Sequence, residues 1–146
     1  MPLFHTQSRE ALRQVYVEAW RKHRAGLPME PLEAQVADVI ALHPEYHAAL
    51  DRPDAALEHD YTPEGGQSNP FLHMGLHLAV RDQLATDRPA GIRHAFQSLA
   101  QRVGDAHEAE HRLIECLAEA LWEAQRAGRA PDEQAYLQRV RRIAAA

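Results

Sequence analysis

The sequence predicts an all-α fold, a compact helical bundle of about five to six helices, and three observations favour it. Glycine is scarce, at 7 of 146 residues, and alanine is abundant. No stretch alternates cleanly between apolar and polar residues, and apolar residues recur at steps of three and four instead. A chain of this length can bury about two thirds of its unfolded surface, which is enough for one core. We therefore expect a single helical domain over residues 1–146.

The first helix is expected from about residue 8 to residue 25. Ser8 is a good N-cap, and Gly26 and Pro28 supply the stop signal. The arginines of this helix, Arg13, Arg21 and Arg24, are expected to lie away from the core. One face of this helix, at steps of three and four, holds Leu12, Val15, Tyr16, Ala19 and His23.

The second helix is expected over about residues 30–42, and His43 follows on its apolar face. Pro44 then interrupts the helical pattern, because the residue before a proline is pushed out of the α region. We expect His43 to end this helix and Pro44 to open a short new one that contains His47. Simple i, i+4 geometry therefore does not guarantee that His43 and His47 meet.

Residues 52–68 are expected to form an irregular loop, which leads directly into the central helix. Asn69 as N-cap and Pro70 at the first position begin that helix, and it ends near Thr86. Its first half is apolar on most sides, which is typical of a core helix. Gly75 is expected to let another backbone approach closely.

Three more helices are expected downstream. One begins at Pro89, and the longest runs from its cap Asp105 to Ala127, before Gly128. Pro131 begins the last, short helix. The apolar stripe of the longest helix follows Val103, His107, Glu110, Ile114, Leu117 and Leu121, with His111 beside it.

Composition limits the classes of partner and location. The formal net charge is -5, so we expect no nucleic-acid partner. No apolar run is long enough for a membrane span. The single cysteine, Cys116, cannot form an internal disulfide, and the first ten residues do not read as a signal peptide. A cytoplasmic protein is therefore expected, and we leave a homodimer open.

Histidine is the unusual residue, with 10 in the chain. Six of the ten form three pairs with a spacing of four: His43 with His47, His73 with His77, and His107 with His111. Two ligands four apart on a helix share one face, with about 6 Å between their Cβ atoms, which suits two imidazoles on one metal. We expect these pairs to converge on a metal in the helical core. The others, His5, His23, His59 and His94, are expected in solvent or packing roles.

Glu110 strengthens the metal hypothesis, because it lies near the centre of an apolar stripe between His107 and His111. A buried carboxylate is costly unless it is paired or bound to a cation. The expected metal ligands are therefore His73, His77, His107, His111, Glu110, His47 and His43. Glu108 and His111 match the spacing of ferritin-like dinuclear sites, but no second such motif is present. A histidine-rich set with few carboxylates is closer to haemerythrin in ligand type.

The segment HEAEH also satisfies the H-E-x-x-H pattern of zinc proteases, through His107, Glu108 and His111. In that case Glu108 would be the general base and zinc would activate a water molecule. A zinc protease usually adds a substrate-binding sheet, and the sequence predicts no strand. The peptidase reading is therefore a minor alternative.

Three segments together resemble a known family: HPEYH, GGQSNPFLHMGLHLAVRDQL and DAHEAEHRLIECLAEALWEAQRAGRAPDEQAYL. They are similar to the bacterial domain-of-unknown-function family numbered 1841, over about residues 5 to 142. NPFLHMGLH is the most specific part. The resemblance implies a small bacterial protein, and its motif histidines map onto the three pairs above. One departure is Asp82, where the family pattern leads us to expect glutamate.

The expected function is metal binding by a helical bundle. The leading hypothesis is a dinuclear site with iron, manganese or zinc, which supports redox or hydrolytic chemistry if a coordination position is open. Metal storage, metal sensing or a structural metal is the second hypothesis. A metal-free helical interaction module is the third. The sequence identifies no substrate and no catalytic residue.

Overall fold

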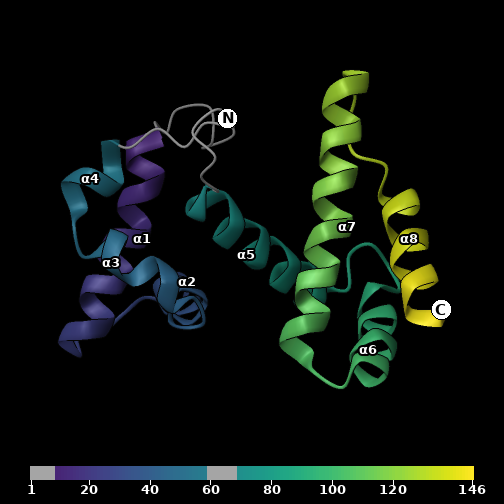
Figure 1. Cartoon of the computed structure of the whole chain (residues 1–146), viewed down its shortest axis with the longest axis horizontal. Helices are drawn as coiled ribbons and strands as arrows, with labels where there is room; N and C mark the ends of the chain where they lie inside the picture. The colour runs from purple at the N-terminus through teal and green to yellow at the C-terminus, as the bar shows by residue number, and fades with distance from the viewer. Residues whose placement is uncertain (1–8, 59–68) are drawn as a thin grey trace. The chain divides into compact units, whose positions relative to one another are not determined.

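The computed structural model describes residues 9–58 and 69–146, and every regular element within them is helical (Figure 1). Six of the helices in these ranges have 11 or more residues. No strand occurs in the described part of the chain. The all-α prediction is confirmed.

The chain divides into two compact units, Met1–Gly75 and Leu76–Ala146, and the division falls inside one continuous helix, α5 (Pro70–Thr86). The single domain expected from the length of the chain stays a prediction. None of the described helices is both long and apolar enough to cross a membrane.

The first unit is built from α1 (Arg9–Ala25), α2 (Pro31–Ala41), a 3₁₀ turn η2 (Pro44–Tyr46), α3 (His47–Leu50) and α4 (Pro53–Glu58) (Figure 1). Helix α1 packs against α2 and α4. The start of α2 is fixed by a capping box, in which the Glu33 carboxylate accepts a hydrogen bond from the Glu30 backbone N–H at 2.9 Å. The predicted break before Pro44 is confirmed, because α2 ends at Ala41 and the chain restarts as η2 and α3.

The buried face of α1 differs from the predicted one. Arg13 is buried at 3% exposure, whereas Leu12 is 40% exposed, so the prediction that Arg13 lies away from the core was wrong. The Arg13 guanidinium donates to the Ala56 carbonyl at 3.1 Å and lies 4.8 Å from the centre of the Phe71 ring. These two contacts offset the cost of burying a charge, and apolar periodicity alone does not reveal them.

The segment predicted as an irregular loop, residues 52–68, begins with a helix. Pro53–Glu58 forms α4, and Pro53 opens it at a position where the missing N–H costs no helical bond. The rest of the segment, residues 59–68, lies outside the described residues. The predicted cap Ser8 lies outside them too.

The second unit holds the C-terminal part of α5 together with α6 (Ile92–Val103), α7 (Ala106–Ala127) and α8 (Glu133–Ala145) (Figure 1). Helix α6 packs against α7 and α8, and α7 packs against α8. The predicted cap Asp105 is confirmed, because its side chain accepts from the His107 backbone N–H at 3.0 Å. Helix α6 begins at Ile92 rather than at the predicted Pro89, since Gly91 adopts a left-handed conformation immediately before it.

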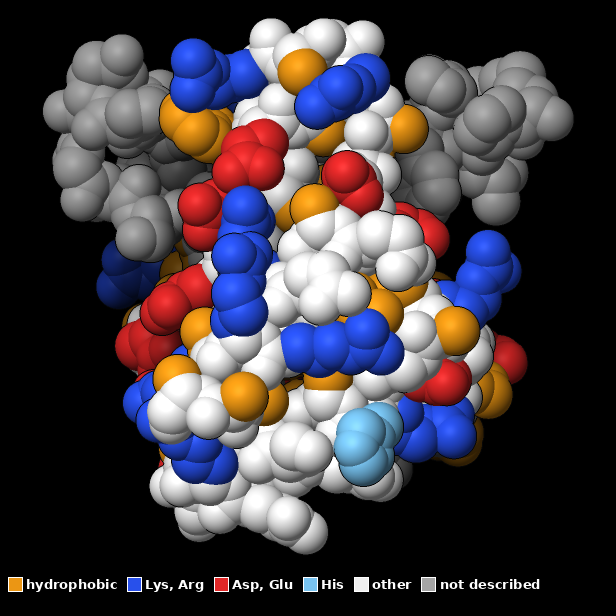
Figure 2. Space-filling view, turned by 90° about the vertical axis from the view of Figure 1, so that its right-hand side faces the viewer, with side chains coloured by type: hydrophobic (Ala, Val, Ile, Leu, Met, Phe, Trp, Pro, Cys, Tyr) orange, Lys and Arg blue, Asp and Glu red, His pale blue; other side chains and the backbone are white. Residues whose placement is uncertain are grey.

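The core of the second unit is apolar and continuous across its helices. Its most deeply buried members include Val80, Ile92, Leu99, Leu113 and Val140. Cys116 belongs to this cluster, so the thiol is packed like a small apolar side chain. Figure 2 shows the face on the side of α8, where acidic and basic side chains are mixed and hydrophobic atoms form only small separate areas among the described residues.

Candidate metal centre

Helix α5 places His73 and His77 four residues apart on one helix. The Asn69 side chain caps this helix as predicted, accepting from the backbone N–H groups of Phe71 at 3.0 Å and Leu72 at 3.2 Å. Pro70 occupies the first helical position. His77 is fully buried, while His73 is half-buried. His73 and His77 therefore lie one turn apart on α5, as their spacing predicted.

In the first unit, helix α2 ends before Pro44, and the His43 ring lies against α5. His43 adopts φ -125° and ψ 70°, which lies outside the α region that the following proline disfavours. Its Nδ1 donates to the Val39 carbonyl at 2.7 Å, and its ring meets the His73 ring edge-on with 5.1 Å between centroids. Tyr46 stacks on His43 at 5.4 Å, and burial together with the charge of Glu45 raises the pKa of the Tyr46 hydroxyl.

In the second unit, α5 and α7 bring three histidine rings together. The His77 centroid lies 4.9 Å from that of His111 and 5.9 Å from that of His107. His107 and His111, four apart on α7, have their centroids 4.3 Å apart. His77 on α5 therefore faces the predicted pair His107 and His111 on α7.

Glu110 approaches this group from α7 and contacts His77 directly. Its Oε1 accepts from His77 Nδ1 at 2.8 Å and from Arg81 Nε at 3.0 Å. Burial raises the pKa of the Glu110 carboxyl, but the hydrogen bonds from His77 and Arg81 and their charges outweigh burial, so its pKa lies below the usual value. Glu110 is thus a buried carboxylate with two donors, one of which is a histidine of the site.

These local relationships bring four histidines into one group. His43 contacts His73, the α5 helix itself links His73 to His77, and His77 contacts His111. One ring nitrogen from each of the four lies within 4.8 Å of those of the other three. The group His43, His73, His77 and His111, called the four-histidine cluster below, could hold a metal ion.

The other predicted ligands lie outside this cluster. His107 borders it through its ring contacts, and Glu110 borders it through His77. His47 has a different partner, because its Nε2 donates to the Ile40 carbonyl at 2.8 Å and its ring packs on Trp20 at 4.3 Å. His23 and His94 are exposed, as expected, and His5 and His59 lie outside the described residues.

The residues of the zinc-protease pattern do not all join the four-histidine cluster. Glu108, its would-be general base, is exposed and pairs with Arg112 at 3.6 Å. His111 belongs to the four-histidine cluster, whereas His107 does not. The geometry therefore gives no support to the peptidase alternative.

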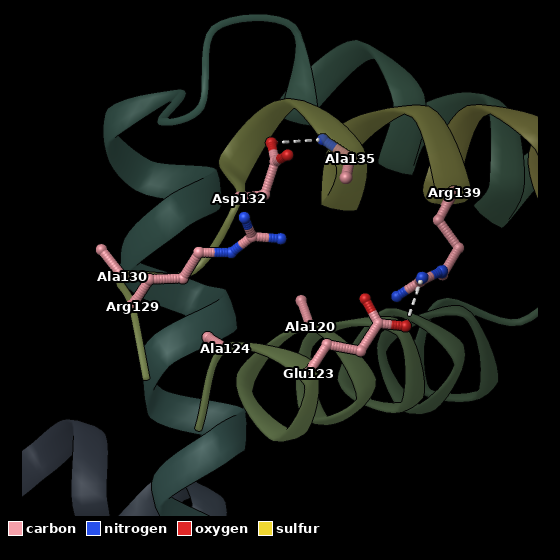
Figure 3. Close-up of a pocket in the computed structure, with 8 residues that line it drawn as sticks. All are labelled: Ala120, Glu123, Ala124, Arg129, Ala130, Asp132, Ala135 and Arg139. Carbon is pink, nitrogen blue, oxygen red and sulfur yellow. Dashed lines mark hydrogen bonds and ion pairs between the residues drawn. The ribbon is translucent and has the colours of Figure 1, made fainter. Parts of the chain in front are cut away.

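A separate hollow of about 220 Å³ lies where α7 turns into α8 (Figure 3). Arg139 donates across it to Glu123 at 3.1 Å, and Asp132 caps α8 by accepting from the Ala135 backbone N–H at 3.0 Å (Figure 3). Ala120 on its floor is nine residues beyond His111, which is about 13 Å along one helix. Its polar groups pair α7 with α8 and do not contribute to the histidine group.

Sequence reasoning missed Arg81 and Tyr46 as neighbours of the site. Arg81 carries a usable signal, because it follows His77 by four residues and so lies on the same face of α5. Tyr46 carries none, since its place beside His43 depends on how η2 folds after Pro44.

Comparison with known proteins agrees with the resemblance seen in the sequence. No curated protein and no solved structure matches this chain. The family described as a domain of unknown function (DUF1841) matches residues 8–142, a range that includes the whole four-histidine cluster and Glu110. The chain therefore belongs to the DUF1841 family.

Proposed function

We propose that this protein binds a transition-metal ion through His43, His73, His77 and His111. The observation that carries the proposal is the proximity of their four ring nitrogens, which lie within 4.8 Å of one another. In a tetrahedral zinc site with zinc–nitrogen bonds of about 2.0–2.1 Å, the nitrogens are roughly 3.3 Å apart. Binding would draw the most distant of these nitrogens closer by about 1.5 Å at most.

The ligand chemistry favours iron or zinc over manganese among the metals predicted from the sequence. The cluster offers only imidazole nitrogens, and imidazole suits zinc, copper, iron and nickel. Manganese, like magnesium and calcium, prefers oxygen ligands. Glu110 supplies the nearest buried carboxylate, but its oxygen Oε1 already accepts from two donors.

The number of ligands favours a non-catalytic metal. Four protein ligands complete a tetrahedron, which is typical of structural zinc sites, whereas catalytic zinc keeps one position for water. Storage, sensing or structural metal binding is therefore the role that this geometry supports best. A six-coordinate iron would retain two open positions, and redox or hydrolytic chemistry stays the alternative on that basis.

The dinuclear site predicted from the sequence needs ligands beyond the four-histidine cluster. His107 and Glu110 border the cluster and are the residues that a second metal ion would use. The metal-to-protein ratio separates the two arrangements. A ligand role for His47, a homodimer and a cytoplasmic location stay predictions.

The test is the metal content of the full chain, produced without a histidine tag. We expect one equivalent of iron or zinc per chain, and a rise in melting temperature when the ion is added to metal-free protein, because a ligand that binds only the folded state stabilises it. Two equivalents would support the dinuclear alternative. The proposal fails if no metal is present in stoichiometric amounts and neither iron, zinc nor manganese shifts the melting temperature.

A further inference from the structure

We propose that Glu110 and Arg81 are positioning residues that hold His77 with its proton on Nδ1, so that Nε2 is the nitrogen that binds the metal. The inference rests on the proposed metal site and explains how one of its ligands, His77, is oriented. It also assigns Glu110 a role beside the metal rather than on it.

The hydrogen bond between His77 and Glu110 fixes which ring nitrogen carries the proton. A carboxylate can only accept, so His77 Nδ1, 2.8 Å from Glu110 Oε1, must be the donor. The His77 side chain is 0% exposed and that of Glu110 is 11% exposed, which shields this bond from competing water. With the proton on Nδ1, the lone pair of a neutral imidazole is on Nε2.

Arg81 positions the Glu110 carboxylate, which in turn positions His77. Its Nε donates to the same Oε1 atom at 3.0 Å, and it stands one helical turn after His77 on α5. A guanidinium keeps its charge and presents its donors in a fixed plane, so it sets both the position and the ionised form of its partner. Arg81 is therefore the outermost member of a chain of three residues that ends at the metal-binding nitrogen.

The same arrangement occurs at a second member of the four-histidine cluster. His43 Nδ1 donates to the Val39 carbonyl at 2.7 Å, which also leaves Nε2 as the lone-pair nitrogen. His43 and His77 are the two buried members of the cluster. The Val39 carbonyl orients His43, and the Glu110 carboxylate orients His77. Both kinds of group are common partners of metal-binding histidines. Only the carboxylate can be removed by mutation.

The experiment combines ring-nitrogen NMR of the metal-free full chain with metal titration. Long-range proton–nitrogen spectra report which nitrogen of His77 carries the proton, and no metal is needed for this readout. We expect the Nδ1–H form in the wild type. We expect the Nε2–H form, which a histidine side chain favours in water, in Glu110→Ala. The affinity for zinc should fall by about 10- to 100-fold in Glu110→Ala, the range found when an outer partner of a metal ligand is removed.

Two further variants separate orientation from general damage to the fold. Glu110→Gln keeps an oxygen that can accept from Nδ1, so it should retain the wild-type form of His77 and lose less affinity than Glu110→Ala. His94→Ala removes an exposed histidine and should bind zinc like the wild type. If Glu110→Ala does not fold, the wild-type spectrum still decides, because an Nε2–H form of His77 there overturns the inference.

The outcomes also distinguish this inference from the proposed function. Zinc binding of equal strength in wild type and Glu110→Ala would overturn the positioning role and leave the metal site standing. An Nδ1–H His77 in a wild-type protein that binds no metal would overturn the metal site instead.

Discussion

The imidazole of His43 meets that of His73 edge-on, with 5.1 Å between the ring centroids, although thirty residues separate them in the sequence. His43 therefore joins the four-histidine cluster through a residue of another helix, and not through His47, its neighbour in spacing. The break at Pro44 is the physical cause, because it sends His43 and His47 to different partners.

This separation predicts opposite outcomes for two neighbouring histidines. His43→Ala removes a member of the cluster and should weaken metal binding by a factor of about ten or more, which is at least about 1.4 kcal/mol. His47→Ala removes a ring that hydrogen-bonds the Ile40 carbonyl and should leave metal affinity unchanged while lowering stability by about 1 kcal/mol. Zinc titration and urea unfolding of both variants check this, with His94→Ala as the control. Equal metal loss in the His43 and His47 variants would show that His47 is a ligand after all.

Arg13 should contribute to stability in spite of its charge. Arg13→Ala removes its hydrogen bond to the Ala56 carbonyl and its contact with the Phe71 ring, so the free energy of unfolding should fall by about 1–3 kcal/mol. The matched control is Arg24→Ala, since Arg24 forms an exposed pair with Asp51 that is worth about 0–1 kcal/mol. Urea denaturation of the two variants gives the comparison, and a smaller loss for Arg13→Ala than for Arg24→Ala would contradict the buried placement of Arg13.

Two glycines should respond in opposite directions to alanine. The nearest neighbour of a Cβ at Gly75 is the Tyr16 hydroxyl at 3.6 Å, an ordinary contact with a side chain rather than the close backbone that the sequence suggested. Gly75→Ala in the interior of α5 should therefore raise stability by about 0.5–1 kcal/mol. Gly128 has φ +67°, so Gly128→Ala should lower stability by about 1 kcal/mol. Thermal unfolding measures both, and a destabilised Gly75→Ala would mean that α5 is packed more tightly at this point.

Tyr136 should make the fold sensitive to alkali. Burial, with the nearby Cys116 thiol as a smaller cause, raises the pKa of the Tyr136 hydroxyl above its usual value of about 10. Above that pH the unfolded chain loses a proton that the folded chain keeps, so stability falls as pH rises, by about 1.4 kcal/mol at pH 11.

The variant Tyr136→Phe isolates this effect. At pH 7 it should be about 1 kcal/mol less stable than the wild type, because the hydroxyl donates to Gln83 at 2.7 Å. Between pH 9 and pH 11 its stability should fall less than that of the wild type. Urea midpoints of both proteins measured across this range test the prediction. Parallel pH profiles would exclude Tyr136 as the cause of the alkaline loss of stability.

Several features that local rules govern were predictable from the sequence, although Pro89 and Pro131 do not begin the helices expected from them. Asn69 with Pro70, Asp105 and Gly128 mark helix ends through capping chemistry that needs no tertiary contact, and all of them fall where expected. Histidine spacing likewise predicted that histidines of α5 and α7 meet, and His77 contacts His111.

The features that depend on tertiary partners were not predictable. Arg13 lies on the buried face because its guanidinium donates to the Ala56 carbonyl and packs on the Phe71 ring. Both partners are distant from Arg13 in the sequence. The bond from Glu110 to His77 likewise needs α5 and α7 to pack in one particular register. Apolar periodicity predicted that Glu110 is buried, but it could not predict which groups donate hydrogen bonds to its carboxylate.

The most direct test of the central claim is X-ray absorption spectroscopy at the metal edge of the zinc- or iron-loaded protein. For zinc, four nitrogen neighbours at about 2.0–2.1 Å, with the multiple-scattering pattern of imidazole rings, are predicted. The pattern should lose one imidazole in His111→Ala. A first shell made mainly of oxygen atoms, or one that is unchanged in that variant, would contradict a metal held by His43, His73, His77 and His111.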